Sequence, residues 1–473
     1  MNARVLLMLA GGAAVVWSFW RWRTAVQVAM VLLIFEGAIR KWLFPGSQDL
    51  VYFAKDVFFL GAYLGFLRDL PRLRYRPPPL PAFYGVLVLA AVLALLQVFN
   101  PALPNLLVGV FGFKAYFFYA PLLFVVPAAF PSDAALYRFL RRYALISIPV
   151  GLLAVSQFFS PATSVLNTYA RTSEDVYIAT FGSSTYVRVT ATFSFITGYT
   201  AYLLATVILV LALLGAGRWR FRGHLPLFGA LGMTVLGMLM TGSRTPVLML
   251  ALLLPPYWWL AVIRERGGRV AFGRLVLAMA LVAGFLVFAG EDALGAFYGR
   301  ALGVSDVPGR ISSPLLSPYL LLPDAGLLGF GTGATHQTAA ALAPNVVPYS
   351  WLHGLLVEVE SGRVMLELGA LGFLLIYFLR LYLAGFALRQ VFALRTRFHR
   401  AIATATFLVS LTALPGAVVF DVTGDVYYWF FAGLLMLAVR LDREAVKAAA
   451  PAAAASAVRH EAAVPVPAAR GTA

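Results

Sequence analysis

The chain has 473 residues, of which 61% are hydrophobic and 12% are charged, and its formal net charge is +17. Charged residues make up about a quarter of a soluble domain, so this composition, with a mean hydropathy of +0.84, excludes an ordinary soluble protein. The absence of cysteine excludes disulfides, thiol nucleophiles and cysteine-based metal sites.

The charge pattern indicates a membrane protein rather than a nucleic-acid-binding one. Many apolar segments reach the roughly 18 residues that mark a spanning helix. The arginines lie in short clusters between these segments, which is the positive-inside pattern. None of the five histidines is paired at metal-ligand spacing, so no metal and no other cofactor is expected. The predicted fold class is an all-α, polytopic transmembrane helix bundle in a lipid bilayer, without a nucleic-acid partner.

The first part of the chain predicts six spanning helices, and the first of them is uncleaved with its N-terminus outside. An arginine-rich loop at 68–79 that ends in three prolines marks the cytoplasmic side, as do Arg138, Arg141 and Arg142. The predicted segments are Val5–Trp20, Thr24–Leu43, Val51–Leu67, Pro81–Phe99, Lys114–Phe130 and Leu145–Phe159.

The rest of the chain predicts a further seven segments, which gives about 12–13 helices because boundaries drawn from sequence shift by a few residues. Asp421 and Asp425 are interpreted as residues of the outer turn between the last two. The segments are Thr192–Leu214, Leu225–Met240, Val247–Ile263, Leu275–Ala289, Val364–Leu383, Ala401–Leu414 and Tyr427–Val439.

The predicted organisation follows from these segments. Transmembrane helices occupy residues 1–290 and 363–440, and a large outer loop occupies residues 291–362. Residues 441–473 are rich in alanine and proline without periodicity, so they predict a disordered cytoplasmic tail.

The stretch from Glu291 to Glu367 is the only long run between apolar segments that is neither apolar nor simply basic. A polar segment of this size is costly to hold against a bilayer unless it faces water and functions there. It predicts a loop that covers the bundle on the non-cytoplasmic side and completes a site for an anionic substrate. Its Gly329-Phe-Gly-Thr-Gly333 run does not follow a strand of a nucleotide-binding unit, and is predicted to form tight turns.

Isolated arginine and lysine residues lie on the predicted outer side, although the positive-inside rule places most such residues on the cytoplasmic side. One arginine at a helix end is usually a headgroup anchor or half of an ion pair. Several on one face favour a phosphate ligand, because guanidinium groups bind phosphate oxygens bidentately, and a diphosphate at the membrane surface fits best. The set is Arg40, Lys41, Lys55, Lys114, Arg188, Arg244, Arg300, Arg310 and Arg363.

Arg244 follows Thr-Gly-Ser in a turn between two apolar helices and begins the second of them. The N-terminus of that helix favours an anion, and Ser243 adds a hydroxyl. Both residues are therefore candidate diphosphate ligands, and a helix-turn anchor is the alternative.

Glu360, Arg363 and Glu367 lie three and four residues apart at the head of a helix, so they share one face. A self-neutralising ion network and a catalytic group are both compatible with this spacing. His353 and Glu358 are alternative proton acceptors nearby.

Several of these motifs follow one another in a fixed order. Ser243-Arg244 begins a late helix, and a long outer loop with an arginine and the Gly-Phe-Gly-Thr-Gly run comes next. A helix reading Glu367-Leu-Gly369-Ala-Leu-Gly372 follows. This order resembles the O-antigen ligase and polymerase superfamily, over Arg188 to about Leu383.

The resemblance implies a GT-C-like, metal-independent glycosyltransferase that uses sugar chains linked to undecaprenyl diphosphate. Its site would face the periplasm from the bacterial inner membrane. Arg244 and Arg310 would match the arginines that hold the diphosphate, with help from Arg188 and Arg363. The ligase pattern has a His-Asn shortly before the Glu-x-Gly helix, whereas this chain has none there, which favours the polymerase branch or a carboxylate base.

The resemblance therefore implies a polymerase of undecaprenyl-diphosphate-linked oligosaccharide repeats for O-antigen or exopolysaccharide. Glu360 or His353 would take the proton from the attacking hydroxyl. A flippase and a chain-length regulator are expected partners. The alternatives are a ligase that moves glycan to a lipid or protein, and a transporter of polysaccharide or lipid-linked sugar. The transporter is disfavoured because the charges cluster at one surface and no internal repeat is visible.

Overall fold

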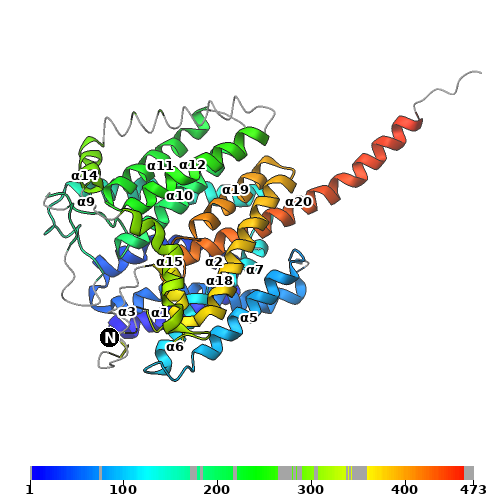
Figure 1. The fold of residues 1–473 in the computed structure, drawn as a ribbon. Coiled ribbons are helices and arrows are strands. Elements are labelled where there is room, and N and C mark those ends of the chain that lie inside the picture. The colour runs from blue at the N-terminus through cyan, green and yellow to red at the C-terminus, as the bar shows by residue number, and fades with distance from the viewer. Residues whose placement is uncertain are drawn as a thin grey trace, which may run out of the picture.

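The computed structural model describes residues 3–73, 77–170, 178–181, 185–216, 221–264, 290–302, 307–336 and 359–462, together with residues 280, 284, 339, 342 and 343. In this part of the chain the regular elements are helices, and strand-like pairing is limited to a bridge between Thr180 and Val187. Figure 1 shows the helices packed as a bundle from which the end of α20 (Val422–Ala462) projects. The all-α class is confirmed.

The α-helices described up to residue 159 are α1 (Ala3–Trp20), α2 (Trp22–Ala38), α3 (Gln48–Tyr52), α4 (Ala54–Asp69), α5 (Pro81–Gln97), α6 (Leu106–Phe117), α7 (Leu122–Ala129), α8 (Asp133–Leu145) and α9 (Ser147–Phe159). A π-helical turn, η1 (Ile39–Leu43), continues α2.

Two of the predicted segments differ from the structure. The span predicted at Lys114–Phe130 is broken into α6 and α7, which are bent by 45°. Pro121 stands at the start of α7, where it has no N–H to continue the hydrogen bonding of α6. The span predicted at Leu145–Phe159 begins at Asp133, so the arginines expected on the inner face belong to α8.

The α-helices described after residue 190 are α10 (Ile196–Ala216), α11 (Phe221–Met240), α12 (Arg244–Arg264), α14 (Glu291–Leu302), α15 (Val307–Ala325), α18 (Glu360–Ala393), α19 (Arg397–Thr412) and α20. The predicted outer loop is therefore helical over much of its described part. The segment predicted at Leu275–Ala289 lies, apart from residues 280 and 284, outside the described residues.

Seven described segments are long and apolar enough to cross a membrane, or eight if the bent α6–α7 pair is one span. The 12–13 helices are predicted for the whole chain, whereas this count covers the described residues alone, and some predicted segments form shorter apolar helices, such as α1 and α5. The seven are Trp22–Leu43, Pro45–Arg72, Asp133–Phe159, Ile196–Ala216, Gly223–Met240, Glu360–Ala393 and Val422–Val446. The chain is a multi-pass membrane protein.

The C-terminal part differs from the disordered tail predicted from residue 441. Helix α20 continues to Ala462, so residues 441–462 are helical. Alanine has the highest helix propensity, and the alanine runs of this segment outweigh its lack of apolar periodicity.

Glycines bring helices into backbone contact within the bundle. A Cβ on Gly61 of α4 would lie 2.6 Å from the carbonyl oxygen of Val15 in α1. A Cβ on Gly433 of α20 would lie 2.5 Å from the carbonyl oxygen of Leu122 in α7. Small residues let membrane helices approach closely, since lipid supplies no hydrophobic drive for their association.

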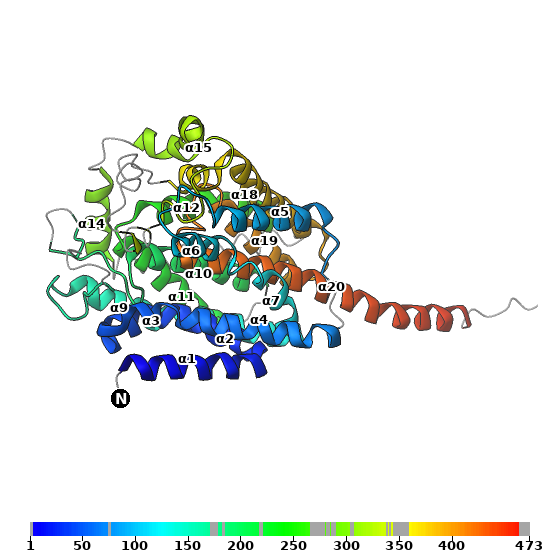
Figure 2. The ribbon, with the colours of Figure 1, turned by 90° about the horizontal axis from the view of Figure 1, so that it is seen from below.

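The candidate site lies at one end of this bundle. Figure 2 shows α3, α9 and α14 gathered at that end, whereas the C-terminal part of α20 leaves from the opposite end. We refer to the former as the α3 end.

Candidate functional site

Arg188 is held against the turn that joins α11 to α12. Its Nε donates to the carbonyl oxygen of Thr241 at 2.9 Å, and its Nη2 donates to the hydroxyl of Ser243 at 3.2 Å. The backbone N–H of Val189 donates to the carbonyl oxygen of Met240 at 3.1 Å. Side-chain and backbone hydrogen bonds thus join two segments that are far apart in the sequence.

The turn itself requires a glycine. Gly242 has a φ of +62°, and a Cβ there would lie 2.8 Å from the ring of Phe181 and 3.0 Å from Nε of Arg188. Helix α12 begins two residues later, at Arg244. The structure therefore brings three of the predicted diphosphate ligands, Arg188, Ser243 and Arg244, together at the N-terminus of α12.

The segment after Arg188 connects this turn with the cations at the end of α2. Lys41 donates from Nζ to the carbonyl oxygen of Ala191 at 2.6 Å. Arg40 donates from Nη1 to the hydroxyl of Ser194 at 2.9 Å. These hydrogen bonds place Arg40 and Lys41 against the segment that follows Arg188, at the α3 end.

The cations of α4 and α6 lie in a buried ion network. Nζ of Lys55 lies 2.7 Å from Glu36, and Nζ of Lys114 lies 2.6 Å from Asp56. The Tyr119 hydroxyl donates to the same Asp56 at 2.5 Å. Lys55 and Lys114 were predicted to be candidate phosphate ligands, but in the structure carboxylates neutralise them. The two ion pairs hold α4 against α2 and α6.

The Gly-Phe-Gly-Thr-Gly run is joined by its backbone to the head of α18. The N–H of Phe330 donates to the carbonyl oxygen of Leu366 at 2.8 Å, and the N–H of Gly331 donates to that of Glu367 at 3.0 Å. These are the two motifs that the sequence resemblance singled out, and the fold places them in contact.

This contact depends on glycines with positive φ. Gly369 has φ +65° and ψ −172° and interrupts α18, and a Cβ on it would lie 2.3 Å from the carbonyl group of Leu327. A Cβ on Gly329, whose φ is +73°, would lie 2.6 Å from the backbone nitrogen of Gly369. The prediction that these loop glycines form tight turns is confirmed.

Glu367 anchors the loop to α18. Its Oε2 accepts from the N–H of Gly333 at 3.0 Å, and its Oε1 accepts from the N–H and the hydroxyl of Thr335 at 2.9 and 2.7 Å. The side chain is fully buried, so these donors replace the water that a carboxylate would otherwise require.

Arg363 lies beside the same threonine. Its Nε donates to Oγ1 of Thr335 at 3.2 Å, and its Nη2 donates to the Thr335 carbonyl oxygen. The guanidinium carbon lies 3.7 Å from the centre of the Phe420 ring, which is a close cation–π contact. Arg363 and Glu367 therefore meet at Thr335, as expected for residues on one face of the helix.

Glu360 turns towards a different part of the bundle. Its Oε1 forms an ion pair with Arg380, and its Oε2 accepts from the N–H groups of Val418 at 2.6 Å and Phe420 at 3.1 Å. Both charged side chains are buried. These contacts occupy the carboxylate and position the 418–420 segment. Arg380 was missed by sequence reasoning, because it lies inside an apolar run.

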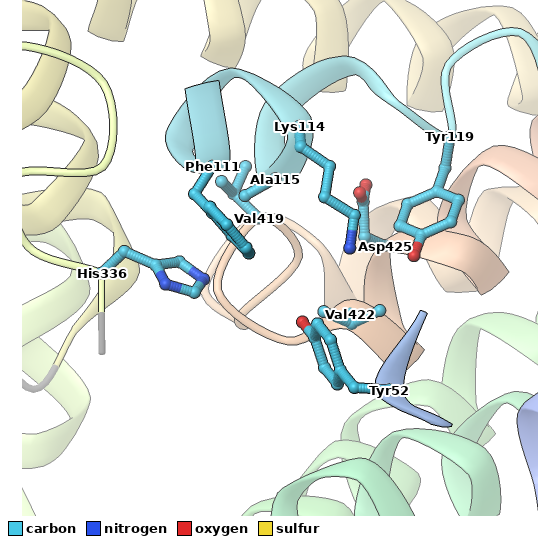
Figure 3. Close-up of a pocket in the computed structure, with 9 residues that line it drawn as sticks. All are labelled: Tyr52, Phe111, Lys114, Ala115, Tyr119, His336, Val419, Val422 and Asp425. Carbon is cyan, nitrogen blue, oxygen red and sulfur yellow. The ribbon is translucent and has the colours of Figure 1, made fainter. Parts of the chain in front are cut away.

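A small pocket lies between α3, α6, the glycine-rich loop and the start of α20. Figure 3 shows His336 on one side of it and Lys114, Tyr119 and Asp425 on the other. Its lining comprises Tyr52, Phe111, Lys114, Ala115, Tyr119, His336, Val419, Val422 and Asp425.

His336 enters this pocket as a neutral group. Burial lowers the pKa of His336 to about 4, and the positive charges of Arg363 and Lys114 act in the same direction. The imidazole therefore carries no charge at neutral pH. Nothing near His336 in the sequence shows that Lys114 or Asp425 lies across a pocket from it.

The two aspartates expected in the last outer turn have different positions. Asp421 precedes α20 and accepts from the N–H of Thr423 at 3.1 Å, and burial raises its pKa to about 6. Asp425 is not a turn residue, because α20 begins at Val422. It lies in the first turn of that helix with 1% of its surface exposed.

Three further predicted residues remain without a described side-chain contact. Arg310 lies in the first turn of α15, which reaches the head of α18 through a 2.8 Å hydrogen bond from the Ser361 hydroxyl to the Pro314 carbonyl oxygen. The side chain of Arg310 lies outside the described part, as do His353 and Glu358. Their roles stay predictions, including a site that Arg310 and Arg244 share.

Comparison of the chain with protein family models, with curated proteins and with solved structures gives no match. Among the residues described, no group of three His, Asp or Glu side chains is placed to hold a metal ion. The function therefore has to be argued from the geometry of the site.

Proposed function

We propose that the chain is a membrane glycosyltransferase that polymerises undecaprenyl-diphosphate-linked oligosaccharide repeats for O-antigen or exopolysaccharide. Its GT-C-like scaffold would lie in the bacterial inner membrane with the α3 end facing the periplasm. The observation that carries the proposal is the grouping of Arg188, Ser243 and Arg244 at the N-terminus of α12.

This grouping has the chemistry that a diphosphate requires. Thr241 and Ser243 fix the Arg188 guanidinium beside a helix N-terminus, whose unpaired N–H groups and dipole favour an anion. Arg244 stands in the first turn of the same helix. As the sugar departs, negative charge grows on the leaving diphosphate, and positive charge held in place beforehand stabilises that charge.

The described contacts narrow the choice of proton acceptor. Glu360 is occupied by Arg380 and by two backbone N–H groups, so we assign it the positioning of residues 418–420 rather than the base role. His353 and Glu358 remain the candidate bases. Arg363, stacked on Phe420 at the head of α18, is a candidate to help stabilise the negative charge that grows on the leaving diphosphate.

A transporter of lipid-linked sugar is the second candidate. Charged side chains inside membrane-spanning segments often mark a transport pathway, and Glu36, Lys55 and Asp56 are buried in such segments. These charges pair with one another and with Lys114, which favours a structural role and ranks the transporter below the transferase.

Product sizing tests the proposal. Purified protein in lipid nanodiscs is incubated with a polyprenyl-diphosphate oligosaccharide, and the glycans are separated by length. A ladder of products supports a polymerase, and a single transfer to an added lipid or protein acceptor would instead indicate a ligase. Movement of the substrate across the bilayer without any new glycosidic bond would establish the transporter and refute the transferase.

A further inference from the structure

Helix α15 exposes a broad apolar surface on the outside of the bundle. It packs against the head of α18 through Leu321 and Ala325, and Figure 2 shows it at the edge of the bundle. Its outward side carries four large side chains, those of Leu315, Leu316, Tyr319 and Leu320. The exposed fraction is 81% for Leu315 and 74% for Tyr319. Proteins rarely leave a contiguous apolar patch of this kind in water, so it marks an interaction surface.

The polar side chains of α15 lie along one edge of that surface. Ser313, Ser317 and Asp324 are spaced four and seven residues apart, so they share one edge of the helix, which we call the polar edge. The remaining side packs on α18. An apolar side next to a polar edge is typical of a helix that lies in the plane of a bilayer interface, where tyrosine is also enriched.

The apolar surface of α15 continues onto a helix that is long enough to cross the membrane. The chain turns after α15 at Gly326, whose φ is +59°, and Leu327 remains exposed. The N–H of Leu371 in α18 donates to the carbonyl oxygen of Leu327 at 3.2 Å. Leu371 and Leu374 are exposed as well, and both belong to the apolar span Glu360–Ala393. The acyl chains that surround α18 therefore reach the end of α15.

The backbone at this junction is paired in the way that a lipid environment requires. Helix α18 is interrupted at Gly369, and the N–H groups that follow the break find acceptors in the turn after α15. Ala370 donates to the carbonyl oxygen of Gly326 at 3.0 Å, and Leu371 donates to that of Leu327. Non-helical backbone is tolerated at membrane depth only where the protein satisfies its polar groups. This pairing favours lipid over a water-filled space.

We propose that α15 is an interfacial helix. Its apolar side lies among the acyl chains of the leaflet at the α3 end, and its polar edge faces the headgroups and water. Lipid is favoured over a second copy of the chain because the surface is continuous with the exposed side of α18. The contact goes beyond the proposed function, since a transferase and a transporter could both use it. It anchors to the membrane a segment that the sequence predicts to be an outer loop.

Spin labels test the proposal, and the chain suits them because it contains no cysteine, so each single-cysteine variant takes one label. Leu316→Cys and Leu320→Cys probe the apolar side, and Ser317→Cys probes the polar edge. Leu374→Cys in α18 is the lipid reference, and Thr163→Cys, in an exposed turn after α9, is the water reference. The full chain in nanodiscs is measured by power-saturation EPR. Collisions with oxygen, which concentrates in lipid, and with the water-soluble nickel chelate NiEDDA give the depth of each label.

The two labels on the apolar side should collide mainly with oxygen, as the label at Leu374→Cys does. We expect Leu316→Cys and Leu320→Cys to lie about 5–10 Å into the boundary between headgroups and acyl chains, the depth of an interfacial helix. Ser317→Cys should lie closer to water. None of these side chains is buried, so the labelled variants should keep the melting temperature of the unlabelled protein.

Three outcomes would overturn the proposal. Labels at Leu316→Cys and Leu320→Cys with the collision profile of Thr163→Cys would place α15 in water. Labels that collide with neither reagent would show that protein covers the surface, and a short distance between labels on two copies would identify a dimer. A label at Ser317→Cys that lies deeper than the label at Leu320→Cys would reverse the orientation of the helix.

Discussion

Nη2 of Arg188 donates to the hydroxyl of Ser243 at 3.2 Å, which places a guanidinium group against the residue that precedes α12. The geometry follows from the positive φ of Gly242, which lets the chain turn between Thr241 and Ser243 around the arginine. The anion-binding character that we assign to this turn rests on that relationship.

Replacement of Arg188 by lysine should reduce polymer formation by about 10- to 100-fold, because a lysine keeps the charge but loses the fork that contacts Thr241 and Ser243 together. Yield is measured by product sizing at equal protein incorporation. Arg389→Lys, at an exposed position of α18, is the matched control and should match the wild type. Full yield in Arg188→Lys would remove Arg188 from the diphosphate site.

Gly369→Ala should lower the free energy of unfolding by at least about 2 kcal/mol, because its φ and ψ suit glycine alone and its Cβ would overlap the Leu327 carbonyl. Gly385 lies on the same helix with open space around it, so Gly385→Ala should be neutral or stabilising. Denaturation in detergent compares the two. Equal stability of both variants would show that the loop and α18 do not depend on this contact.

Arg380→Met should destabilise the fold by about 3–5 kcal/mol, because it leaves the buried Glu360 carboxylate without its cation. The double variant Glu360→Gln/Arg380→Met should be less destabilised, since no unpaired charge remains. A double-mutant cycle of unfolding free energies measures the coupling. A Glu360→Gln variant with wild-type stability and no transfer would instead make Glu360 the base.

His336 gives a prediction for the pH dependence of stability. Its pKa falls from an ordinary 6.5 to about 4 on folding, so between these values the unfolded chain binds more protons than the folded protein. Stability should therefore fall as the pH is lowered from about 6.5 towards 4, and His336→Gln should remove part of that loss. Melting temperatures across this range measure it. An unchanged acid dependence in His336→Gln would place the titrating group elsewhere.

The all-α membrane class could be predicted from the sequence because it depends on apolar run length alone. The ends of helices were harder to predict, because they depend on single residues such as Pro121 and on the alanine runs after residue 441. The turn at Arg244 could be predicted because Thr-Gly-Ser-Arg interrupts two apolar runs. Arg188 was grouped with it as another isolated cation on the predicted outer side.

The partners of buried charges could not be predicted, because ion pairs between helices depend on packing. Lys114 appeared as a candidate phosphate ligand, but the fold places it 2.6 Å from Asp56. Asp425 was predicted to be a turn residue that faces water. Helix α20 begins at Val422, however, so Asp425 lies in its first turn and lines a pocket. Spacing along one chain carries no information on either outcome.

The transfer assay on Arg244→Lys tests the central claim most directly. The variant, its Arg389→Lys control and the wild type are incubated at equal incorporation with the same polyprenyl-diphosphate oligosaccharide, and product length and initial rate are measured. The account predicts a ladder from the wild type and the control, and a loss of about 10-fold or more in the rate for Arg244→Lys. A wild-type rate in Arg244→Lys would contradict it.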